Sequence, residues 1–143
     1  GYGLSYTSFA YSNLVICQKS VKPYDSVTVR VDVQNTGKRG GDEVVQMYVS
    51  DREASVIRPV MELAGFRRIS LKPGEKKTVS FTCKASQFAF LDADMKWKVE
   101  AGEMEVRIGA ASNDIRLKDS FEIEKDGFVD GATRGFFAAT SEQ

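Results

Sequence analysis

One short segment restricts the fold of this chain more than any other part of its sequence. Across residues 27–34, apolar and polar residues alternate strictly, and all four apolar positions are valine. A period of two places successive side chains on opposite faces of a β-strand, so one face is buried and the other is hydrated. Burial of each valine contributes roughly 1.5–3 kcal/mol, and a shift by one residue would expose the whole set. The segment therefore predicts a half-buried strand with a fixed register.

Shorter stretches of the same kind recur along the chain. Strands are predicted at residues 9–16, 43–50, 63–71, 78–83, 88–91, 97–99, 103–109 and 116–123. Turn residues separate them, and Pro73-Gly74 is one of the clearest signals. Near Ser12 and Asn13 the apolar residues change phase, which predicts a β-bulge. About seven to eight short strands with regularly spaced turns are typical of an all-β, two-sheet antiparallel sandwich.

Two parts of the chain differ in character. Residues 1–123 carry the strand pattern and predict one sandwich domain, whereas residues 124–143 lack it. Glycine recurs at every fourth position from residue 127 to residue 135, and the end of the chain is rich in small and polar residues. This composition predicts a flexible C-terminal tail, although Phe128, Phe136 and Phe137 leave open that part of it docks on a surface.

The composition excludes several classes of function. The 20 basic and 20 acidic residues balance each other, whereas nucleic-acid-binding domains carry an excess of basic charge. No apolar run approaches the ~20 residues of a membrane-spanning helix, so we expect neither a nucleic acid nor a membrane as a partner. Histidine is absent, which removes Ser-His-Asp and Cys-His nucleophiles and histidine zinc sites. We expect no catalytic residue, no metal site and no cofactor.

The two cysteines do not indicate a metal site either. Cys17 and Cys83 are far apart in the sequence, whereas metal-binding cysteines come in closely spaced pairs. Cys83 lies on the same predicted strand face as Val79 and Phe81, which predicts a buried free thiol. The sequence leaves open whether the two cysteines are reduced or joined in a disulfide.

Two features suggest chemistry on sugars, but each has a simpler explanation. Hydrolysis of a glycoside needs two carboxyl groups that flank the bond to be cleaved. The pairs Asp92 and Asp94, and Glu100 and Glu103, lie at predicted turns, where carboxylates are hydrated. Sugar binding by stacking needs exposed aromatic rings, but Trp97 lies at strand spacing among apolar neighbours and is expected in the core.

Several segments of the chain resemble one domain of a known enzyme family. In order they read GYGLSYT (residues 1–7), VQNTG (33–37), GDEVVQMYV (41–49), RPVMELAGF (58–66), LKPGE (71–75) and WKVEAG (97–102). In this order and spacing they are similar to the C-terminal domain of family 3 glycoside hydrolases, the β-glucosidase and β-xylosidase group. The resemblance implies a fibronectin type III-like, immunoglobulin-like sandwich.

The resemblance also implies a function. In this family the nucleophilic Asp and the acid/base Glu lie in other domains, and neither motif occurs in this chain. The resemblance thus implies a non-catalytic accessory domain that packs against and stabilises the catalytic domains of the same parent chain, a β-glucosidase/β-xylosidase-type hydrolase. It also implies a secreted or periplasmic location, and it leaves a homo-oligomer formed through the parent open. A carbohydrate-binding or adhesion module of sandwich fold is the alternative.

The expected contact with the catalytic domains combines two parts of the sequence. Tyr2, Tyr6 and Tyr11 lie near the start of the chain, where an upstream domain would be adjacent. Arg58 and Pro59 lie in the longest irregular connection of the domain. Long loops often carry functional contacts, and arginine is frequent at the hot spots of interfaces. These residues form the predicted interdomain interface.

Overall fold

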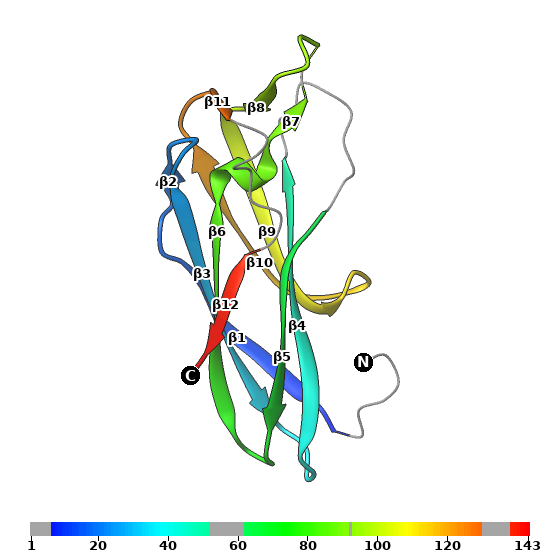
Figure 1. The fold of residues 1–143 in the computed structure, drawn as a ribbon. Coiled ribbons are helices and arrows are strands. Elements are labelled where there is room, and N and C mark those ends of the chain that lie inside the picture. The colour runs from blue at the N-terminus through cyan, green and yellow to red at the C-terminus, as the bar shows by residue number, and fades with distance from the viewer. Residues whose placement is uncertain (1–6, 52–61, 92, 130–137) are drawn as a thin grey trace.

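Two β-sheets pack face to face and enclose the apolar core (Figure 1). The computed structural model describes residues 7–51, 62–91, 93–129 and 138–143. The four-stranded sheet contains, in spatial order, β1 (Phe9–Ile16), β3 (Ser26–Asn35), β6 (Lys76–Lys84) and β12 (Ala139–Glu142). The five-stranded sheet contains β2 (Ser20–Val21), β10 (Asp114–Ile123), β9 (Gly102–Ala111), β4 (Gly41–Asp51) and β5 (Glu62–Leu71).

A third sheet of three short strands lies at one end of the sandwich (Figure 1). It contains β11 (Gly127–Val129), β8 (Trp97–Val99) and β7 (Phe90–Leu91), and a 3₁₀ turn, η1 (Ala85–Phe88), precedes β7. Of the predicted strand 88–91, only Phe90 and Leu91 form a strand, β7, and Phe88 lies in the 3₁₀ turn. The predicted strand 97–99 is β8, and it pairs with β7. Trp97 is half-buried and packs against the core, as its spacing predicts.

The valines of residues 27–34 lie in the core, as their alternation predicts. Val27, Val29, Val31 and Val33 are each at most 1% exposed. Their strand, β3, lies between β1 and β6 and forms backbone hydrogen bonds along both edges. The register pairs Val31 with Val79 of β6, which keeps the apolar side chains of both strands on the inner face. The strand pattern and the two packed sheets confirm the predicted sandwich.

The predicted β-bulge in the first strand is present. The pairing of β1 with β3 shifts between Ser12 and Val15, and Asn13 has a φ of 54°. Asparagine adopts this left-handed region more readily than most residues, and its Nδ2 donates a hydrogen bond to Oδ2 of Asp32 at 2.8 Å. Because the bulge changes the phase of the alternation, both end residues of β1 are buried.

Part of the predicted flexible tail forms strands, which corrects that prediction for these residues. β11 pairs with β8, and β12 pairs with residues 79–82 of β6. The composition of the tail does not reveal this, because a strand at a sheet edge is held largely by backbone hydrogen bonds, which any sequence without proline provides. Residues 130–137 of the tail lie outside the described part.

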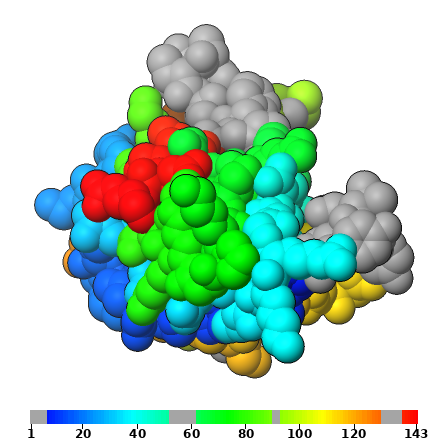
Figure 2. Space-filling view, turned by 90° about the horizontal axis from the view of Figure 1, so that it is seen from below, coloured from blue at the N-terminus to red at the C-terminus, as the bar shows by residue number. Residues whose placement is uncertain are grey.

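The two long sides of the sandwich are closed by different strands. β12 pairs with β6 of one sheet and contacts β5 of the other, and β1 contacts β10 on the opposite side. The view from below shows β12, in red, against the green surface of β5 and β6 (Figure 2). β1 and β12 therefore cover the core along the two long edges of the sandwich.

Candidate interdomain interface

The structure describes one of the five residues predicted for the interface. Tyr2, Tyr6, Arg58 and Pro59 lie outside the described residues, so their role stays a prediction. Tyr11 lies on β1, is half-buried and packs against the core. Its contribution to an interface also stays a prediction, and within the domain it contacts Glu43 and Arg116.

Tyr11 connects three strands at the side closed by β1. Its hydroxyl donates a hydrogen bond to Oε2 of Glu43 on β4, with 3.1 Å between the oxygens. The guanidinium carbon of Arg116 on β10 lies 5.3 Å from the centre of the Tyr11 ring, within reach of a cation–π contact. Nη1 of Arg116 also donates to the backbone oxygen of Phe9 at 3.0 Å. These contacts join β1 of one sheet to β4 and β10 of the other.

Burial controls the protonation of this cluster. Glu43 is 6% exposed, and burial raises the pKa of its carboxyl group above the ordinary value. Burial, reinforced by the Glu43 charge, also raises the pKa of the Tyr11 hydroxyl, so the hydroxyl stays protonated and donates its hydrogen bond to Glu43. In contrast, hydrogen bonds from Arg116 lower the pKa of Asp114. The cluster thus contains a buried carboxylate beside a fixed ion pair.

Asn35, the last residue of β3, holds the start of the described chain against one end of the sandwich. This side chain is fully buried. Its Oδ1 accepts hydrogen bonds from Oγ1 of Thr7 at 2.7 Å and from the backbone nitrogen of Gly37 at 2.9 Å. Its Nδ2 donates to the backbone oxygens of Arg39 at 2.7 Å and Leu71 at 3.1 Å. One side chain therefore joins the entering chain to two turns of the sandwich.

The turn after Asn35 fits the entering chain closely. The backbone nitrogen of Thr36 donates to the oxygen of Ser8 at 2.8 Å. A Cβ atom at Gly37 would lie 1.8 Å from Oγ1 of Thr7, so only glycine leaves room for this contact. The sequence motifs did not predict this role. Its one signal is an asparagine at an inward position of a strand that otherwise buries valines.

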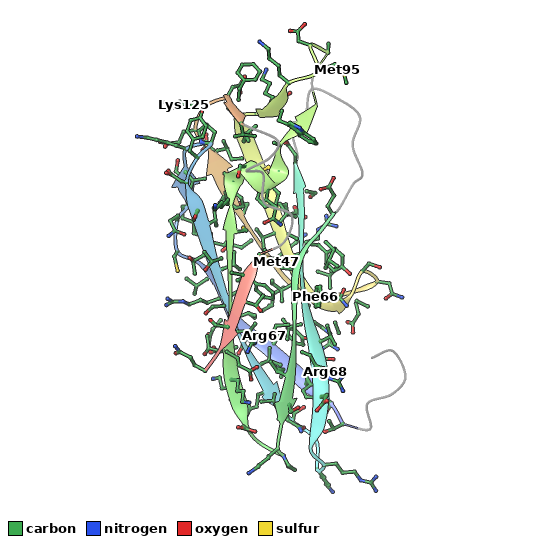
Figure 3. The ribbon with its side chains drawn as sticks, in the orientation of Figure 1. Met47, Phe66, Arg67, Arg68, Met95 and Lys125 are labelled. Carbon is green, nitrogen blue, oxygen red and sulfur yellow. The ribbon has the colours of Figure 1, made fainter. Side chains whose placement is uncertain are left out.

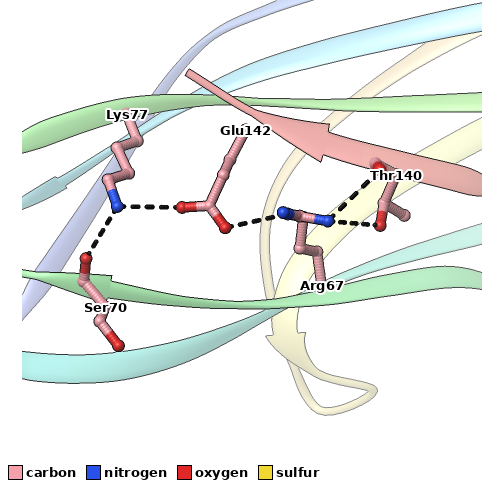
Figure 4. A network of polar contacts seen from close by, with 5 residues as sticks. All are labelled: Arg67, Ser70, Lys77, Thr140 and Glu142. Carbon is pink, nitrogen blue, oxygen red and sulfur yellow. Dashed lines mark hydrogen bonds and ion pairs between the residues drawn. The ribbon is translucent and has the colours of Figure 1, made fainter.

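The C-terminal strand is held by an ion-pair network (Figure 4). Oε1 of Glu142 lies 3.0 Å from Nε of Arg67 on β5, and Oε2 lies 3.0 Å from Nζ of Lys77 on β6. Arg67 also donates to the backbone oxygen of Thr140 at 3.3 Å, and Lys77 donates to that of Ser70 at 3.2 Å. The hydrogen bond from Lys77, followed by that from Arg67, lowers the pKa of Glu142. One carboxylate thus links the edges of both sheets.

The described residues offer no cluster suited to bind a metal ion. No group of three or more His, Cys, Asp or Glu side chains among them could hold one. Cys83 is buried and free, which confirms the prediction, and burial raises the pKa of its thiol to about 12. Cys17 is exposed and also free. Within the described part, no helix has the length and hydropathy of a membrane span.

These features define a class of protein: an immunoglobulin-like β-sandwich whose polar side chains fasten strands to one another. Residues 43–112 match the family model of the fibronectin type III-like domain. This part of the chain is a fibronectin type III-like domain, as the motifs of the sequence predict.

The relatives of the chain are β-glucosidases and β-xylosidases. It is 46% identical over 124 residues to the thermostable β-glucosidase B of Acetivibrio thermocellus, and 45% identical over 123 residues to the periplasmic β-glucosidase of Salmonella typhimurium. Each alignment covers 86% of this chain and 16% of the relative. The solved β-glucosidase 3B of Thermotoga neapolitana, in complex with α-D-glucose, superposes with a TM-score of 0.81 at 36% identity, over 90% of this chain and 17% of that one. These matches confirm the resemblance predicted from the motifs, and the chain corresponds to a small part of each relative.

Proposed function

We propose that this chain is a non-catalytic C-terminal accessory domain of a β-glucosidase-like glycoside hydrolase, and that it packs against and stabilises the catalytic domains. One observation carries the proposal: most of this chain, 86%, aligns with only 16% of a β-glucosidase. A sandwich with its own core supplies a rigid surface on which other domains can pack, and the fold alone does not define a function. The polar clusters described above fasten strands of the sandwich to one another.

The proposed mechanism is mechanical. Asn35 holds the chain at Thr7, so the direction in which the chain enters the sandwich is fixed by hydrogen bonds. A fixed entry restricts the orientations that the domain samples relative to its neighbours, which lowers the entropy lost on packing. The proposed interface includes the predicted residues Tyr2, Tyr6, Tyr11, Arg58 and Pro59.

The partner and the location follow from the same proposal. The partners are the catalytic domains of the parent chain, and the substrate of the parent is a β-linked glucoside or xyloside. The location is secreted or periplasmic, which the name of the Salmonella typhimurium relative supports.

The test compares the parent enzyme with and without this domain. We expect removal of the domain to lower the melting temperature of the catalytic domains, because an apolar interface becomes exposed. Calorimetric titration of the chain with cello- and xylo-oligosaccharides should give no heat of binding. Unchanged stability of the shortened enzyme would refute the proposal, and clear oligosaccharide binding would support a carbohydrate-binding module in its place.

A further inference from the structure

The outer face of β4 and β5 carries apolar side chains that do not belong to the core. Along β4 the side chains of Glu43, Val45, Met47 and Val49 point inward and are buried, so those of Val44, Gln46 and Tyr48 point outward. The register places two outward residues of β5 beside them: Phe66 pairs with Gln46, and Leu63 pairs with Tyr48. We call Val44, Gln46, Tyr48, Leu63 and Phe66 the Phe66 patch.

The patch combines a buried aromatic ring with exposed apolar side chains. Tyr48 is 9% exposed although it lies outside the core cluster, and its hydroxyl donates a hydrogen bond to Oε1 of Gln46. Leu63 is 38% exposed and Phe66 is 53% exposed. Figure 3 shows Phe66 and Arg68 on one side of β5 and Arg67 on the other. Single exposed apolar residues are common, whereas a contiguous group marks an interaction surface.

Ion pairs flank the patch on two sides. At the β5 side, Nη2 of Arg68 lies 2.7 Å from Oδ2 of Asp42. At the β9 side, Arg107 pairs with Glu105 and lies opposite Tyr48 in the sheet. An apolar and aromatic centre with a polar, arginine-containing rim is the usual composition of a protein–protein interface.

Two observations favour one kind of partner for this face. The chain corresponds to 16–17% of its relatives, so a large body of protein is available to pack on it. The connection that contains Arg58 and Pro59 joins β4 to β5, the two strands that carry the patch. We propose that the Phe66 patch is the surface on which the catalytic part of the parent chain docks. This inference rests on the proposed function and names the face that performs it.

A sugar fits this face less well than a protein. Stacking on a pyranose ring needs an open aromatic face, but the Tyr48 ring is almost fully buried and Phe66 is the one exposed ring of the patch. A protein surface instead uses apolar area of any shape, and a partly exposed phenylalanine beside a leucine provides it. The patch therefore selects a protein partner over an oligosaccharide.

The experiment measures two melting temperatures for each of two variants. Phe66→Ser and Phe128→Ser remove phenylalanines that are both 53% exposed and both lie on strands, β5 and β11. Each variant is made in the 143-residue chain and in the parent enzyme. We expect Phe66→Ser to lower the melting temperature of the parent by about 3 °C more than that of the chain. Phe128→Ser should lower both by similar amounts.

Each other outcome overturns the inference in a recognisable way. If Phe66→Ser and Phe128→Ser behave alike in the parent while removal of the whole domain still destabilises it, the docking face lies elsewhere and the proposed function stands. If removal of the domain has no effect, the proposed function itself fails. If the chain alone forms a dimer in light scattering that Phe66→Ser disrupts, the patch binds a second copy. If Phe66→Ser abolishes binding of a cello-oligosaccharide, the patch is a sugar site.

Discussion

The start and the end of the chain are fastened to the sandwich by different kinds of contact. At the start, Asn35 is fully buried and Glu43, the partner of Tyr11, is 6% exposed. At the end, the side chains of Arg67, Lys77 and Glu142 are 32%, 27% and 21% exposed, and β12 has four residues. A buried hydrogen bond is costly to break because its groups are then left with neither a partner nor water. The groups of a partly exposed ion pair become hydrated when the pair separates.

This contrast predicts which side of the sandwich opens more easily. A segment held by few buried contacts opens locally at a lower free energy than the core strands do. We therefore expect the side closed by β1 to open only with global unfolding and the side closed by β12 to open on its own.

Asn35→Ala should have the largest effect, because it removes four side-chain hydrogen bonds at once. Each buried group left without a partner costs about 1–3 kcal/mol, so we expect the free energy of unfolding to fall by about 3 kcal/mol or more in urea titrations. Asn113→Ala, at an exposed turn, is the control and should change it by less than ~0.5 kcal/mol. Equal losses in the two variants would contradict a special role of the buried asparagine.

Tyr11→Phe should have the next largest effect. It leaves the buried Glu43 carboxylate without the hydroxyl that donates to it. A hydrogen bond to a charged group contributes about 1.5–3 kcal/mol, and the loss should appear in urea unfolding at neutral pH. Tyr24→Phe is the matched control, because its hydroxyl donates to the backbone oxygen of Phe128 while the residue is 66% exposed. A loss as large for Tyr24→Phe as for Tyr11→Phe would show that burial does not decide the cost.

Glu43→Gln should change stability in a way that depends on pH. The pKa of Glu43 is raised in the folded protein, so its contribution to stability is fully present below the ordinary pKa of a glutamate and is lost as pH rises through the raised value. We expect Glu43→Gln to be more stable than the unmodified chain at pH 7, with a difference of about 1 kcal/mol that shrinks toward pH 4. A stability difference of the same size at both pH values would mean that burial does not destabilise the charged carboxylate.

Glu142→Gln should have the smallest effect on global stability, about 0.5–1 kcal/mol. Because the pKa of Glu142 is lowered, the stability that it contributes is present above the ordinary carboxyl pKa and is lost as pH falls through the lowered value. Its pH dependence is therefore opposite in sign to that of Glu43. Thr78 and Gln143 each donate a backbone hydrogen bond to the other's backbone oxygen, and hydrogen exchange of these two amides should accelerate.

Two controls accompany this variant. Glu122→Gln changes an exposed glutamate on β10 and should leave the exchange of these amides unchanged. Added salt of about 1 M shortens the screening length to roughly 3 Å, so it should accelerate exchange at β12 in the unmodified chain and remove most of the difference. Exchange at β12 as slow as in β3 would show that the end of the chain does not open separately.

The strand pattern and the bulge could be predicted because their signals are local. The alternation of residues 27–34 requires one buried face whatever lies opposite, and the change of phase at Ser12 and Asn13 can be compensated only by an irregularity in the strand. The outward positions of β4 follow from the same alternation. The register of β4 with β5 brings Phe66 beside Gln46, and it cannot be predicted from the sequence of either strand alone.

The contacts of the chain ends could not be predicted because they join residues far apart. Glu142 and Arg67 are separated by 75 positions, and Tyr11 and Glu43 by 32. Tyr11 was predicted as an interface residue from its place near the start, and the structure adds contacts with Glu43 and Arg116 that no local pattern encodes. Composition also failed to predict β12, whose ordering depends on a vacant strand edge beside it.

The short strand at the end of the chain has a consequence for solubility. A version of the protein that stopped at residue 123, where the strand pattern ends, would keep every long strand but leave the backbone of residues 79–82 without its partner. Uncovered edges of this kind recruit strands from neighbouring molecules and lead to aggregates. At high protein concentration, the last few residues would therefore determine whether this domain stays monomeric or aggregates.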